Sequence, residues 1–135
     1  MIDIVLSLMI AVGVLDHDVC VVSIFGGDAD LHRGGPARYL GRRVESHDRG
    51  VAHRTLPLGA LVAVYLPRTR RVTLARVIDR GPYGARLDDG TYTIKRRARD
   101  PGTWRGCIDL APATAAELGH RGLERAIIMW RGRRL

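Results

Sequence analysis

Two polar residues bracket a strand pair in the middle of the chain. His53 stands before one apolar run, Leu61–Leu66, and Asp79 directly follows a second, Val72–Ile78. The PRTR sequence between the runs has the length of a hairpin turn, and the Gly and Pro residues after Asp79 place this acid at a strand-to-loop corner. Antiparallel pairing of the runs would bring His53 close to Asp79. There the imidazole would hydrogen-bond a substrate or tune the carboxyl, as acid–base catalysis requires.

The two loop sequences around this pair, HRTLPLG and DRGPYG, resemble those of the rare-lipoprotein-A (RlpA-like) double-psi β-barrels, which are related to expansin and barwin barrels. The resemblance continues in CIDLAPATAAELG and in a closing strand at 125–130, and covers residues 20–131. Several members of this family are septal lytic transglycosylases that act on peptidoglycan. The resemblance implies a mainly β fold: a six-stranded double-psi β-barrel with one short helix and a β-hairpin insertion.

The resemblance also implies a set of site residues. Asp79 and His53 are catalytic candidates, and a second acid, Asp109, is expected to point into the same groove. Cleavage of a glycan to 1,6-anhydro-muramyl products needs a carboxyl that serves as acid and then as base, with a pKa raised by burial or by a neighbouring carboxylate. No cofactor and no metal ion is implied. The alternative is structural: both Asp residues cap the turns that follow them, and His53 holds its own loop.

The substrate-binding candidates come from four parts of the chain. Ser23 takes the place of a small hydroxyl residue in the first strand, expected at Val21–Phe25. Arg80 and Tyr83 belong to the DRGPYG turn. The remaining two are Arg42, in the long loop 27–50, and Trp104.

The loop 27–50 departs from the family pattern. Transglycosylase members have a Gly-Glu pair shortly before the His motif, and without gaps this place holds Gly41-Arg42. Glu45 is a catalytic candidate if the loop is re-routed. His47 and Asp48 are further polar candidates in the same loop, and the alternative for all three is a solvated loop.

A second departure follows Gly84, where ARLDDGTYTIKRRARDPGTWRG is longer than the expected link. Asp89-Gly90 is a hairpin turn signal, and Thr91–Lys95 is expected to form a short strand after it. Arginines surround Tyr92 and Trp104 in this insertion. Aromatic faces stack on sugar rings and Arg pairs with carboxylates, so the insertion is either a substrate-binding flap or a charged solvent hairpin.

Length and composition are consistent with one domain. The chain has 135 residues, 16 of them Gly, which suits a loop-rich β fold better than a helix bundle. The formal charge is +8, almost entirely from Arg, since Lys95 is the only lysine. Such a surface suits polyanions, including nucleic acid, anionic lipid and bacterial envelope polymers, or is simply soluble and basic. Cys20 and Cys107 either pair in an exported domain or are two small buried apolar residues.

The ends of the chain set the expected domain limits. Residues 1–18 form an apolar segment that is either a signal peptide, although it lacks basic residues near Met1, or a segment that packs on the fold. Residues 19–131 form the barrel domain, and 132–135 a basic tail. We expect export to the periplasm or cell envelope, or association with a phage, and no stable membrane span. The expected partners are peptidoglycan glycan strands, bound by a monomer.

Three functions remain open at this point. The first is a lytic transglycosylase-type enzyme acting on peptidoglycan. The second is a non-catalytic, expansin-like module that binds peptidoglycan or polysaccharide, which Arg42 in place of the Glu favours. The third is a nucleic-acid-binding barrel, ranked last because only the charge supports it. The feature that separates the first two is whether Glu45 reaches the groove beside Asp79.

Overall fold

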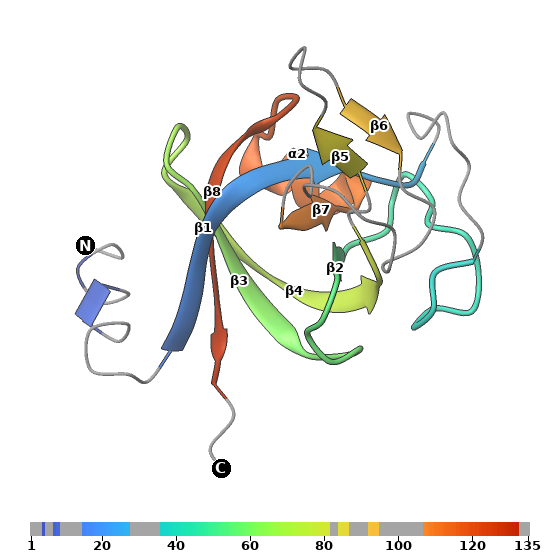
Figure 1. Cartoon of the computed structure of the whole chain (residues 1–135), viewed down its shortest axis with the longest axis horizontal. Coiled ribbons are helices and arrows are strands. Elements are labelled where there is room, and N and C mark those ends of the chain that lie inside the picture. Colours follow the sequence, from blue (N-terminus) through green and yellow to red (C-terminus); the bar gives the residue numbers. More distant parts are fainter. Residues whose placement is uncertain are drawn as a thin grey trace.

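Six strands close into a barrel (Figure 1). A computed structural model of the chain describes residues 4, 7–8, 15–27, 36–81, 84–86, 92–94 and 107–132, with only the backbone described at 84–86 and 92–94. The barrel strands are β1 (Leu15–Ile24), β2 (Val51–His53), β3 (Leu61–Leu66), β4 (Arg71–Asp79), β7 (Ile108–Leu110) and β8 (Glu124–Arg131). Their order around the barrel is β1-β7-β2-β4-β3-β8. With one short helix beside them, they confirm the predicted fold class.

The barrel mixes parallel and antiparallel neighbours. β1 pairs with β7, and β2 with β4, in parallel. The other four neighbouring pairs are antiparallel. A separate two-stranded antiparallel sheet, β5 (Gly84–Arg86) and β6 (Tyr92–Ile94), forms a hairpin where the insertion was expected. The expected strand Thr91–Lys95 is thus present in its central part.

The core lies inside the barrel and follows from the alternation of side chains along each strand. In β3, Val62, Val64 and Leu66 have no exposed surface, while Leu61, at the start of the strand, is exposed. Closing the barrel gives each strand two hydrogen-bonded neighbours, so the apolar faces are buried without leaving an open sheet edge. Branched and small apolar side chains fill this interior.

Two strands differ from the sequence-based expectation. β1 begins at Leu15, within the segment predicted as 1–18 and before the expected start at Val21, because it pairs with β8 from Leu15 opposite Arg131 to Val22 opposite Glu124. The polar stretch Asp16-His17-Asp18 lacks the apolar pattern of a strand, so the sequence did not predict this part of β1. β2 lies between the predicted loop 27–50 and the strand expected at Leu61–Leu66, in a stretch where no strand was predicted. Three residues are too few to show a period in the sequence.

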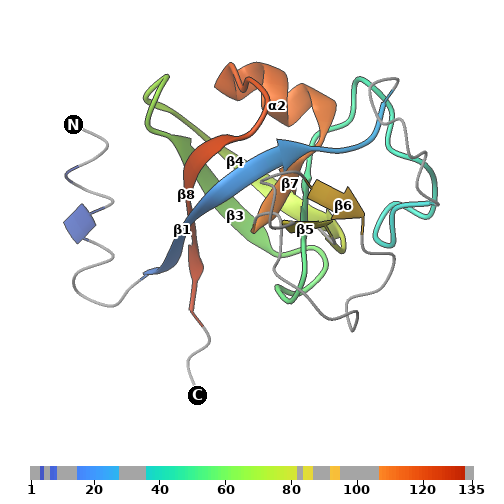
Figure 2. The ribbon, with the colours of Figure 1, turned by 45° about the horizontal axis from the view of Figure 1, so that its top comes forward.

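A proline and a glycine mark the two ends of the helix α2 (Pro112–Leu118). Pro112 stands at its start, and Gly119 ends it in the left-handed conformation with φ 66°. Figure 2 shows α2 at the end of the barrel opposite the start of β1 and the end of β8. Within the described residues, no helix has both the length and the apolar character needed to cross a membrane.

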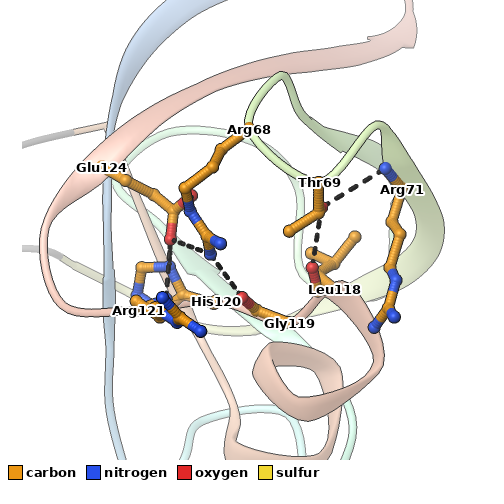
Figure 3. A network of polar contacts seen from close by, with 8 residues as sticks. All are labelled: Arg68, Thr69, Arg71, Leu118, Gly119, His120, Arg121 and Glu124. Carbon is orange, nitrogen blue, oxygen red and sulfur yellow. Dashed lines mark hydrogen bonds and ion pairs between the residues drawn. The ribbon is translucent and has the colours of Figure 1, made fainter.

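The turn between β3 and β4 caps the end of α2 (Figure 3). Thr69 Oγ1 donates to Leu118 O at 2.9 Å, and Arg68 donates to Gly119 O. The last carbonyls of a helix have no partner within it and carry partial negative charge. Hydroxyl and guanidinium donors therefore stabilise this end of α2.

The same guanidinium binds the carboxylate of Glu124, the first residue of β8. The Glu124 carboxylate accepts hydrogen bonds from Arg68 and from the backbone N–H of Arg121, and lies 2.8 Å from His120 Nδ1 (Figure 3). The His120 side chain is almost fully buried. Burial lowers the pKa of His120 despite the neighbouring Glu124, so this imidazole stays neutral near pH 7.

A disulfide joins Cys20 on β1 to Cys107, which directly precedes β7. The two Cα atoms are 5.6 Å apart, within the usual range for this bond. Of the two alternatives for these cysteines, the structure has the covalent pair. It closes a chain segment with a sequence separation of 87 beside the parallel β1–β7 pairing.

Replacing both cysteines by serine is expected to lower the free energy of unfolding by about 4 kcal/mol, because a loop of this length is then free in the unfolded chain. The measurement is urea unfolding of the oxidised wild type and the double variant. Reduced wild type is the matched control and should unfold at the midpoint of the variant. Equal midpoints for all three proteins would contradict a stabilising disulfide.

Candidate functional site

The short strand β2 sets the geometry of the candidate site. Ala52 lies opposite Asp79 of β4 on one side, where the register shifts between Val51 and Ala52, and opposite Asp109 of β7 on the other. Asp109 in turn lies opposite Ser23 of β1. Three predicted site residues, Ser23, Asp109 and Asp79, therefore lie in one row across four neighbouring strands. With Ala52 between the two acids, their Cα atoms are about 10 Å apart, two strand spacings.

Ser23 and Asp109 form a nearly buried polar pair. They are 6% and 7% exposed, and the Ser23 hydroxyl donates a hydrogen bond to Asp109 Oδ1. A buried carboxylate needs such donors to offset its lost hydration. Because β1 lies on the side of β7 away from β2, this bond holds the Asp109 carboxylate toward β1.

Asp79 is the last residue of β4, at the corner that the sequence predicted. Its Oδ1 accepts the backbone N–H of Arg38 at 3.3 Å, and the next N–H, of Tyr39, binds Ile78 O at 2.9 Å. The loop at 36–50 therefore passes over the end of β4. A partly exposed carboxyl against a loop is accessible to a ligand, whereas Asp109 is covered.

His53 lies on the other face of β2. Neighbouring residues in a strand point to opposite faces, so the His53 side chain lies on the face of Val51 and Ile108, not on that of Ala52 and Asp109. Its Nδ1 accepts the backbone N–H groups of Thr55 and Leu56, each at 3.1 Å. The imidazole thus organises its own loop, the structural alternative open from the sequence.

The electrostatics of His53 fit this structural contact. Burial, with the positive charges of Arg54 and Arg80, lowers the pKa of His53 to about 4. The ring is therefore neutral at pH 7, and Nδ1 keeps the lone pair that the two N–H groups need. On its other side the ring lies against Trp130, with ring centroids 6.3 Å apart and a tilt of 53°.

Arg80, the residue after the end of β4, binds the same loop. Its Nη1 donates to His53 O at 3.2 Å and to Leu56 O. This predicted substrate-binding residue therefore fixes the His53 loop to the corner that holds Asp79. Tyr83 and Trp104, predicted as substrate-binding, lie outside the residues that the structure describes.

Arg42, at the position where the sequence resemblance implied a Glu, forms a two-pronged ion pair within its own loop. Its two terminal nitrogens bind the two Asp48 oxygens at 2.7 and 2.8 Å. The Arg42 hydrogen bonds and the N–H of Glu45 lower the pKa of Asp48 to about 2, despite its burial. This bidentate ion pair between Arg42 and Asp48 fixes the conformation of the loop.

Glu45 is exposed on this loop, with 62% of its side chain accessible to solvent. Its Oε2 lies 3.5 Å from His47 Nδ1, and its backbone N–H binds Asp48. The described contact of Asp79 is with Arg38 and not with this glutamate. A catalytic role for Glu45 beside Asp79 stays a prediction that these contacts do not support.

An open groove of about 950 Å³ lies next to the His53 loop and was not expected from the sequence. Leu56 and Ala60 line it together with Trp130, and Arg76 and Arg131 lie at its edges. The sequence indicated Trp130 only as the end of the closing strand at 125–130. The sequence of β8 could not predict this groove, because residues 55–60 from a distant loop form its other side.

Among the described residues, one group of possible metal ligands lies together: Asp18, Cys20 and Cys107. Both sulfur atoms belong to the disulfide, so neither is the thiolate that binds a metal ion. This group therefore carries no metal site.

No protein-family model and no curated protein matches this chain.

The neutral His53 predicts a pH dependence of stability. Its pKa is near 6.5 unfolded and about 4 folded, so the unfolded chain binds more protons between these values. This contribution is present above pH 6.5 and is lost as the pH falls toward 4. We expect a lower thermal unfolding midpoint at pH 4.5 than at pH 7.

The matched variant is His53→Asn, whose side-chain oxygen replaces Nδ1 as the acceptor but does not titrate. It should reduce the difference in midpoint between pH 7 and pH 4.5 without abolishing it, because the pKa of buried His120 is also lowered. An unchanged difference in the variant would contradict a neutral, buried His53.

Proposed function

We propose that this chain is a peptidoglycan-active barrel of the RlpA-like, lytic transglycosylase type, with Asp79 as its acid and base. The observation that carries the proposal is the pairing of β2, in which Ala52 lies opposite Asp79 of β4, just past a register shift, and opposite Asp109 of β7. Within this row Asp79 is the more accessible acid and Asp109 is held by Ser23. The loop residues around Asp79 supply backbone donors and two exposed groups, Arg38 and Tyr39.

One carboxyl is sufficient for this reaction. Asp79 as an acid gives its proton to the glycosidic oxygen, and the bond from that oxygen to the muramyl anomeric carbon breaks. The muramyl C6 hydroxyl then forms a new bond to this carbon, and its proton passes to the Asp79 carboxylate. The acid is regenerated, the product is a 1,6-anhydro sugar, and water is not consumed. A hydrolase pair of carboxylates is therefore not required.

Charge and redox chemistry support the proposed substrate and location. The basic chain, with formal charge +8, suits a glycan that carries carboxylates. The Cys20–Cys107 disulfide suits an oxidising compartment, as an exported envelope protein would occupy. The proposed partner is thus the glycan strand of peptidoglycan, acted on outside the cytoplasm.

The test is mass spectrometry of intact and peptide-stripped peptidoglycan after incubation with wild type and with Asp79→Asn. Wild type should release anhydro-muramyl products, and Asp79→Asn should lower their rate at least 100-fold, since a general acid typically contributes that much. The Asn side-chain oxygen still accepts the Arg38 N–H, so the fold is expected to persist. Equal product from both proteins would overturn the role of Asp79.

A second candidate is a non-catalytic module that binds peptidoglycan. It is favoured by Arg42, which stands at the position of the expected catalytic Glu and forms an ion pair with Asp48. Sedimentation with purified sacculi separates the two candidates. Wild type that pellets with the sacculus and releases no product would identify the binding module. The matched variant Glu45→Gln should leave any cleavage unchanged, because Glu45 is exposed and contacts His47.

A further inference from the structure

The groove beside the His53 loop has a fixed aromatic floor. Trp130, on β8, packs against the barrel core with Leu56 and Ala60, and all three line the groove. The His53 ring braces the Trp130 ring from the side. An indole held in this way offers a rigid, partly exposed face with little conformational entropy to lose on binding.

Two guanidinium groups flank this floor. Arg76 of β4 and Arg131 of β8 both line the groove and are exposed. Arg76 Nη1 donates to Gly59 O at 2.9 Å, which fixes the orientation of the guanidinium plane. The N–H groups on the other side of this plane suit a bidentate contact with a carboxylate. Asp16 is the one carboxylate in the lining, so cationic groups outnumber it. The groove therefore suits a ligand that combines a stacking ring with a negative charge.

The groove is close to the candidate site along the protein surface. Arg76 precedes Asp79 by three residues of β4, a rise of about 10 Å. Gly59 lines the groove and lies against the Tyr39 ring, and the residue before Tyr39 binds Asp79. A single extended chain of sugars can thus follow Tyr39 and Gly59 from one place to the other.

From this geometry we propose that the groove is a second glycan subsite, in which Trp130 stacks on a sugar ring while Arg76 and Arg131 bind its carboxylate. The ligand class is an amino sugar with an acidic substituent, as in the muramyl residues of peptidoglycan. This proposal rests on the proposed function, because it names the part of the same glycan that lies away from the cleavage point. His53 acts there as a positioning residue, through Trp130.

The experiment compares two tetrasaccharides of equal length by isothermal titration: a peptide-free tetrasaccharide of alternating N-acetylglucosamine and N-acetylmuramic acid, and uncharged chitotetraose. Asp79→Asn serves as the background so that no cleavage occurs. We expect about tenfold tighter binding of the acidic sugar, the size of one charge-assisted contact. Adding Arg76→Gln with Arg131→Gln should remove this preference and leave the weaker binding of chitotetraose.

The matched control is Arg125→Gln, which removes the same charge from an exposed position of β8 outside the groove and should keep the preference. The chain has two tryptophans, so Trp104→Phe leaves Trp130 as the single fluorescent reporter, and its emission should change on binding. A preference that survives the double arginine change, or silent Trp130 fluorescence, would overturn the subsite.

The outcomes also separate this proposal from the proposed function. Arginine-dependent binding of the acidic sugar, with no product from peptidoglycan, would support the subsite and reject the enzyme. Cleavage of peptidoglycan at Asp79 with equal binding of both tetrasaccharides would support the enzyme and reject the subsite.

Discussion

The insertion of β2 between β4 and β7 is the constraint on which the rest of the structure depends. Three residues close the barrel on this side, through a parallel pairing with β4 and an antiparallel pairing with β7. Because alternate residues point to opposite faces, the same strand places Ala52 between two acids and turns His53 toward the interior. One short strand thus sets the positions of Asp79 and Asp109 on its two sides, and it braces the Trp130 groove through His53.

Packing at the ends of β2 keeps this strand in place. The preceding Gly50 has φ 143° and lies against the Ile78 side chain, where a Cβ atom would meet that side chain at under 3 Å. Its N–H binds the buried hydroxyl of Thr114 in α2, and its carbonyl accepts the N–H of Ala111. The entry to β2 is therefore tied to both β4 and α2. A glycine is required there because L side chains rarely adopt this φ value.

The sequence predicted the elements with clear local signals and missed those that depend on distant partners. Leu61–Leu66 and the helix at Pro112 were found because apolar alternation, proline and glycine mark them. β2 and the early start of β1 were missed because their pairings with β4 and β8 are what make them strands. Of the candidate site, the corner position of Asp79 follows from the breakers after it. The inward orientation of the His53 side chain could not be predicted, because it depends on the register of β2 with β7, which the sequence does not show.

Arg42 changes the account of the acidic residues more than any other position. Arg42 stands where a second acid was expected, and its ion pair with Asp48 holds two parts of the loop together. Glu45, the other acidic candidate, is exposed at the surface. The proposed reaction therefore relies on Asp79 as its proton donor and acceptor. Attack by the C6 hydroxyl of the muramyl residue on its own anomeric carbon needs only this one carboxyl, because no second carboxylate has to activate water.

The most direct test of this account is to digest peptide-stripped glycan in water enriched in oxygen-18 and to examine the new sugar ends by mass spectrometry. Intramolecular attack predicts anhydro ends that carry no oxygen-18 from the solvent. New reducing ends that carry oxygen-18 and are absent from an enzyme-free control in the same water would mean that water is the nucleophile, and would contradict a mechanism that rests on Asp79 alone.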